Sequence, residues 1–278
     1  MMHLSQKEIL ADGLLLLTAL IWGSAFAVVK NTLDSFPPAA IIAMRYAIAT
    51  VLTGIAFRKH LRGLTRADVA RGALVGLLLS AAYIVQTIGL SFTTASKNAF
   101  LTAVYVMLVP FFSMALFRQK LRRANFAAAA LMLLGIGLLS LDGESGGLNI
   151  GDLLTLICGA LFAGHIIAVE RCQRHTDAYA LLFERGKALD FNAGSVGGLL
   201  SLAIFSTTSA MSLQNIGQSM APASHASILL SLESVLGVVF SCLLLGERVT
   251  PRMLLGFAVI FAALLVSELT PHEKAKTA

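Results

Sequence analysis

Two charged residues lie inside long apolar stretches of this chain, where they could bind a ligand. Arg45 is about midway along the apolar stretch 37–57, and Glu233 is about midway along the stretch 224–245. A charge within hydrocarbon costs about 2.5 to 3.5 kcal/mol on insertion scales, so such a residue is expected to be paired, to face water or to be functional. Arg45 and Glu233 could hold the carboxylate and ammonium groups of a zwitterion, or they could neutralise each other.

Several amides share these stretches and could line a cavity. Tyr83 and Gln86 are three residues apart, so they share one face of a helix. Gln214, with Asn215 beside it, occupies a similar place later in the chain. The alternative role for Gln86 and Gln214 is to bridge neighbouring helices, because amides hydrogen-bond across membrane bundles.

Other polar and aromatic residues are further candidates for a substrate site. His165 lies well inside an apolar stretch and could relay protons, since imidazole titrates near neutrality, or it could be a hydrogen-bonded structural histidine. The rings of Trp22 and Tyr105 could cap a substrate or simply pack. Asn98 is a candidate for the cavity wall, whereas Lys97 is expected at the membrane edge, where its ammonium group can reach water.

The composition shows which elements must position these residues. Of the 278 residues, 57% are hydrophobic and only 13% are charged, whereas soluble domains carry about a quarter charged residues. A helix needs about 20 apolar residues to cross a bilayer. Stretches of this length, rich in Leu and Ala, predict membrane helices and not barrel strands of about ten alternating residues. We therefore predict an all-α polytopic membrane bundle with spans near 10–29, 37–57, 72–92, 95–117, 125–141, 151–169, 192–211, 224–245 and 253–267.

The basic residues predict the orientation of the chain. Five Lys and Arg residues follow the second stretch and four follow the fourth, whereas one follows the first stretch, Lys30, and one follows the third, Lys97. This alternation predicts a cytoplasmic N-terminus, and it explains the net charge of +6 without a nucleic-acid partner. The three cysteines suggest neither a disulfide framework nor a metal site.

The second half of the chain repeats the first. An offset of 140 residues aligns Asp12 with Asp152 and Val29 with Val169. Polar residues and glycines that coincide inside apolar stretches are not easily produced by composition alone. We predict two repeats, residues 1–141 and 151–270, followed by a polar tail at 271–278; five helices each would make the repeats inverted. An offset of 128 residues aligns six residues with identical ones: Gln86, Ile88, Gly89, Ser91, Ala95 and Ser96 with Gln214, Ile216, Gly217, Ser219, Ala223 and Ser224.

The second repeat lacks a clear second helix. Near 178–190 a short apolar stub runs into Glu184, Arg185 and Lys187. Either the chain has nine spans and an extracytoplasmic C-terminus, or it follows a ten-helix plan in which the seventh helix is missing or truncated. The distribution of Lys and Arg is compatible with both.

Several motifs resemble the drug/metabolite transporter superfamily and, within it, the EamA-like family. These are residues 19–30 (ALIWGSAFAVVK), the pair Arg45-Tyr46, residues 231–234 (SLES) and residues 245–248 (LGER). The resemblance covers about 11–268. It implies ten helices in two inverted repeats, a place in the bacterial inner membrane, and export of amino acids or related metabolites through a central cavity.

The sequence also bears on rival functions. It contains no Walker phosphate loop, HExxH pair or nucleophile elbow, so we expect a secondary transporter and not an enzyme, without cofactor or metal. Its expected partners are a small-molecule substrate and the lipid bilayer, and we expect it to act as a monomer by alternating access. A membrane-embedded enzyme, a channel and a scaffold that does not transport are the alternatives.

Overall fold

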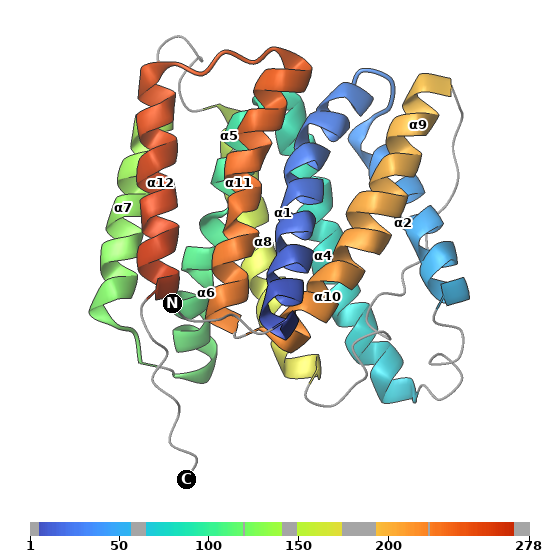
Figure 1. Cartoon of the computed structure of the whole chain (residues 1–278), viewed down its shortest axis with the longest axis horizontal. Helices are drawn as coiled ribbons and strands as arrows, with labels where there is room; N and C mark the ends of the chain where they lie inside the picture. Colours follow the sequence, from blue (N-terminus) through green and yellow to red (C-terminus); the bar gives the residue numbers. More distant parts are fainter. Residues whose placement is uncertain are drawn as a thin grey trace.

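The fold is a bundle of helices, as predicted (Figure 1). The computed structural model describes residues 6–56, 65–118, 120–140, 149–173, 193–221 and 223–269. Within these ranges all regular structure is helical. The elements are α1 (Gln6–Thr32), α2 (Pro38–Ala56), α4 (Arg66–Phe92), α5 (Ala95–Thr102), α6 (Val104–Phe117), α7 (Arg123–Ser140), α8 (Ile150–Gln173), α9 (Ala193–Ser201), the π-helix η3 (Leu202–Ser209), α10 (Ala210–Met220), α11 (Ala223–Leu245) and α12 (Pro251–Leu269).

Length and composition make several of these helices able to cross a membrane. In the described ranges, four helical stretches are long and apolar enough: Gln6–Thr32, Arg66–Phe92, Ala95–Phe117 and Ile150–Ala168. Shorter apolar helices lie at Pro38–Leu52, Arg123–Leu139, Leu229–Leu245 and Pro251–Ser267. The predicted stretch 95–117 is formed by α5 and α6 together.

Two long antiparallel helix pairs flank the centre of the bundle. In the pair α4 and α8, Gly151 at the start of α8 lies against Gly89 near the end of α4. In the second pair, α1 runs against α9, η3 and α10, so that Gly198 lies beside Thr32 and Gly217 lies beside Leu15. The predicted duplication makes these two pairs equivalent, because it aligns α1 with α8 and α4 with α10. The two-repeat division of the chain stays a prediction.

The directions of the helices determine where the chain changes sides. α1 and α4 end at the same face, since Lys30 Nζ donates to the carbonyls of Leu90 and Thr93. α8 begins at that face beside Thr93, so it ends at the opposite one. α9 begins beside Thr32, back at the first face. The described helices α8 and α9 therefore end and begin at opposite faces; the predicted stub near 178–190 lies between them, outside the described residues.

The last two helices return the chain to the face on which it began. α11 runs beside α1 in the same direction, with Leu230 packed near Leu15 and Leu236 against Gly23. α12 then returns beside α7 (Figure 1). The start of α1 and the end of α12 consequently share one face.

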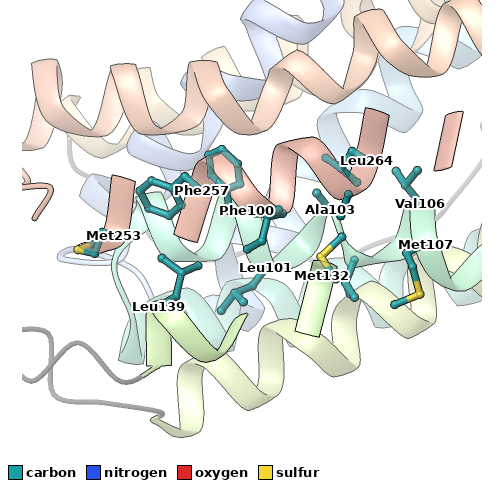
Figure 2. Packing of buried hydrophobic residues seen from close by; sticks show 13 residues of the cluster. Phe100, Leu101, Ala103, Val106, Met107, Met132, Leu139, Met253, Phe257 and Leu264 are labelled. Atoms are coloured by element: carbon teal, nitrogen blue, oxygen red, sulfur yellow. The ribbon is translucent and has the colours of Figure 1, made fainter. Parts of the chain in front are cut away.

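An apolar flank supports the bundle on one side. Figure 2 shows Phe257 and Leu264 of α12 packed with Phe100 of α5 and with Met132 and Leu139 of α7. The rings of Phe100 and Phe257 stack at a centroid distance of 4.4 Å. This α7 and α12 flank joins the last helices of the two repeats by apolar contacts.

Reporters at the chain ends test this topology. Because the start of α1 and the end of α12 share a face, compartment reporters fused to either end of the full chain should give the same signal. A reporter placed in the connection 246–250 should give the opposite signal and serves as the control. Opposite signals from the two ends would show an odd number of crossings.

A glycine at the α4 and α8 contact tests the close packing of this pair. A Cβ on Gly151 would lie 2.5 Å from Gly89 O and 2.8 Å from Thr93 N, both backbone atoms that cannot rotate away. Gly151→Ala should therefore lower the free energy of unfolding by about 1 to 3 kcal/mol, as overpacking does. Gly164→Ala in the same helix is the matched control, because its Cβ would meet nothing within 4 Å. Thermal unfolding in detergent compares the two, and equal midpoints would contradict the close contact.

Candidate functional site

A cavity of about 140 Å³ lies at the centre of the bundle. Its walls come from α1, α2, α4, α5, α6, α8, η3, α10 and α11, whereas the α7 and α12 flank contributes none of its lining residues. One buried water needs roughly 10 to 15 Å³, so this cavity has room for a small ligand of several non-hydrogen atoms.

Most of the predicted site residues meet in this cavity. Asn98 and Asn215 do not line it. Asn98 is fully buried behind the wall, where its amide nitrogen lies 2.7 Å from Thr155 Oγ1, so it links α5 to α8. The predicted residues that line the cavity are Trp22, Arg45, Tyr83, Gln86, Tyr105, His165, Gln214 and Glu233.

The two sequence offsets pair residues that line the cavity. The two offsets place identical amides, Gln86 and Gln214, on the wall, together with Tyr105 and Glu233 as another equivalent pair. Both members of each predicted pair therefore line the same cavity. The remaining equivalent pairs on the wall are Trp22 with Phe162, Ala25 with His165, Phe26 with Ile166, and Tyr83 with Met211.

Arg45 is held by neutral groups. Its Nη2 donates to Ser206 Oγ at 2.9 Å and its Nε donates to Thr207 Oγ1. The guanidinium carbon also lies 4.7 Å from the centre of the Tyr83 ring, a cation–π contact. No carboxylate in the described ranges lies within ion-pair distance of Arg45.

Glu233 brings a carboxylate to the same cavity. It makes no hydrogen bond or ion pair with any residue that the structure describes. Arg45 and Glu233 therefore do not neutralise each other, which was one of the two arrangements that the sequence allowed.

Aromatic rings form much of the remaining wall. Tyr83 and Phe162 meet edge to face at a centroid distance of 5.1 Å, and Tyr105 lies 6.1 Å from Phe162. The indole of Trp22 donates to the carbonyl of Ser206 at 2.8 Å. Phe162 was not among the predicted residues, although its equivalence to Trp22 in the repeat was a signal that could have found it.

Other polar wall residues also tie helices together. Gln86 Nε2 donates to Thr102 Oγ1 at 3.0 Å, so this amide both lines the cavity and bridges α4 to α5. His165 Nδ1 lies 3.1 Å from the carbonyl oxygen of Val75, which joins α8 to α4. The roles of cavity lining and helix bridging, taken as alternatives for Gln86 from the sequence, are thus combined in one residue.

Charged residues from α1, α8 and the connection before α12 lie at the junction between α4 and α5. Lys97 Nζ lies 3.3 Å from Asp152 Oδ2, and both side chains are almost fully buried, at 1% and 2% exposure. The expectation that Lys97 reaches water at the membrane edge was therefore wrong, because its partner on α8 holds it inside. Glu247 accepts from the backbone amides of Ala95 and Ser96 at the start of α5, and Lys30 binds the carbonyls at the end of α4.

Comparison with known proteins agrees with this architecture. The sequence profile of the EamA-like transporter family matches residues 9–141 and 177–269. An uncharacterized transporter of Archaeoglobus fulgidus is 34% identical over 277 residues, which cover 94% of this chain and 87% of that protein. The threonine/homoserine exporter RhtA of Escherichia coli K12 is 31% identical over 182 residues, covering 59% of this chain and 61% of that one. A solved crystal structure shares the fold, with a TM-score of 0.61 at 19% identity, over 93% of this chain and 96% of that chain.

The Lys97 and Asp152 pair can be tested by comparing a single variant with a double variant. Lys97→Met leaves the Asp152 carboxylate buried without its cation, so the free energy of unfolding should fall by about 3 to 5 kcal/mol. Adding Asp152→Asn removes the uncompensated charge and should recover most of this loss, because the amide oxygen can still accept from Thr93. Unfolding in mixed micelles measures both variants. A double variant as unstable as Lys97→Met would contradict the ion pair.

Proposed function

The chain belongs to the EamA-like transporter family, and we propose that it exports small polar metabolites, above all amino acids, by alternating access through the central cavity. It is a membrane transporter by this membership. The proposal adds the substrate class, the direction of transport and the mechanism. It also places the chain in the bacterial inner membrane with its N-terminus in the cytoplasm, as the distribution of Lys and Arg predicts.

The substrate class rests on one observation. Arg45 and Glu233 both line the cavity, but they form no ion pair with each other. A buried charge is costly unless it is paired and hydrogen-bonded. A zwitterion would supply a carboxylate to Arg45 and an ammonium group to Glu233, so its binding would repay the desolvation of both residues. The name of RhtA, a threonine/homoserine exporter, supports an amino acid as the ligand.

The rest of the cavity wall suits the remaining parts of such a ligand. We assign Trp22, Tyr83 and Tyr105 to contact its side chain. Gln86, Gln214 and His165 would hydrogen-bond its polar atoms. Asn98 would act from behind the wall by holding α5 against α8, and Asn215 has no part in the cavity.

Alternating access is supported by the equivalence of the two halves around the cavity. In the proposed mechanism, residues 1–141 and 151–270 rock against each other, and the cavity opens to one side at a time. Val29 of α1 and Leu90 of α4 line one end of the cavity. Beside them, Lys30 of α1 donates to the carbonyls at the end of α4, and this contact joins two walls of the cavity. This contact is the closure that we expect to open in the opposite state.

Transport by the purified full chain in liposomes tests the proposal. Uptake of radiolabelled amino acids should saturate, and Arg45→Gln or Glu233→Gln should raise KM. A hydrogen bond to a charged group contributes about 1.5 to 3 kcal/mol, so we expect about a ten- to hundredfold increase. Arg252→Gln is the matched control, because it removes a cation from an exposed position at the start of α12.

Each other outcome contradicts a stated part of the proposal. Flux that rises linearly with concentration would indicate a channel, and conversion of the substrate would indicate an enzyme. An unchanged KM in both charge variants would remove Arg45 and Glu233 from the site. Vesicles that take up no amino acid would reject the substrate class.

A further inference from the structure

We infer that Ser206 and Thr207 are positioning residues, whose hydroxyl groups orient the Arg45 guanidinium, without forming an ion pair with it, for the carboxylate of the substrate. The identity of the substrate rests on the proposed function. The anion site itself rests on the hydrogen bonds around Arg45.

The two hydroxyl groups hold one edge of the guanidinium. Nε and Nη2 donate to Thr207 and Ser206, which uses two of the five N–H donors of the group. Nη1 and the second proton of Nη2 form the other edge, and a carboxylate can bind such an edge with two parallel hydrogen bonds. Tyr83 covers one face of the plane. The group is therefore fixed on an edge and a face, and no hydrogen bond from a described residue occupies the other edge, which is left for a ligand.

The charge of Arg45 is not cancelled by this arrangement. Both acceptors are neutral hydroxyl groups, and Thr207 Oγ1 donates its own hydrogen bond to the carbonyl of Leu202 at 3.0 Å. A hydroxyl that donates in this way becomes a better acceptor toward the guanidinium. A carboxylate in the same place would pair with Arg45 and remove its attraction for an anion.

The π-helix explains how two adjacent residues reach the same group. In an α-helix, 3.6 residues per turn separate adjacent side chains by about 100°. The wider i to i+5 turn of η3 holds more residues, so adjacent side chains diverge less. Trp22 fixes this segment from α1 through the carbonyl of Ser206. Segments of this kind occur frequently at functional sites.

The internal repeat argues against a role in packing alone. An offset of 128 residues places Leu78 and Leu79 of α4 at the positions of Ser206 and Thr207. There the chain is an ordinary α-helix with apolar side chains, and it packs in the equivalent place of the bundle. The hydroxyl groups and the π-helix are thus found in the half that contacts Arg45.

The single tryptophan of the chain gives a direct test. Trp22 lines the cavity, so its fluorescence should report ligand binding in the purified full chain. The probes are acetate, a bare carboxylate; L-threonine, a zwitterion; and threoninol, which lacks the carboxylate. Thr207→Val removes the acceptor at similar volume, and Thr207→Ser restores it. Thr208→Val is the matched control, because Thr208 makes the same bond to the carbonyl five residues earlier but does not contact Arg45.

We expect Thr207→Val to weaken acetate and L-threonine binding about tenfold, as loss of a charge-assisted hydrogen bond would. Thr207→Ser should recover most of this loss, and threoninol should bind all variants alike. Ser206→Asp should abolish the acetate response by neutralising Arg45. Unchanged acetate binding in Thr207→Val, or an equal loss for threoninol or in Thr208→Val, would overturn the inference, as would a wild-type chain that does not respond to acetate. Failure of the proposed function would be a separate result. If the vesicles transported no amino acid, the acetate titration would still test the anion site.

Discussion

The absence of water from the hydrocarbon core of a bilayer is the constraint on which the other features depend, because each charge and each unpaired backbone group there needs a partner from the protein. The clearest case is the break between α4 and α5. Lys30 of α1 binds the carbonyls at the end of α4, and Glu247 binds the first amides of α5. Lys97 and Asp152 add an ion pair at the same place. The turn between two successive helices is thus what links α1, α8 and the connection before α12.

The central cavity departs from this pattern. Lys97 is matched by an acid, whereas Arg45 is matched by hydroxyl groups, and Glu233 has no partner among the described residues. The same physical rule that stabilises the junction therefore identifies the cavity as the place where a ligand can complete the set of partners. Stability and binding use one kind of interaction, and they differ in whether the protein or the ligand supplies the second group.

Much of the fold and part of the site could be predicted from the sequence. Long apolar stretches were sufficient to locate the helices, and charges within them pointed to Arg45 and Glu233, because both signals are local. Ser206 and Thr207 escaped prediction, since hydroxyl residues are common in membrane helices and their partner is more than 150 residues away. The expectation for Lys97 failed for the same reason, because its partner lies on another helix.

The equivalent pairs on the cavity wall have a consequence for how such a protein can change over evolutionary time. Gln86 and Gln214 are the same in both halves, but Tyr105 is matched by Glu233 and Ala25 by His165. The predicted duplication would allow one half to acquire an ionisable residue while the other keeps the original shape of the wall. Selectivity can then drift by single substitutions in either half, without altering the contacts that hold the two halves together.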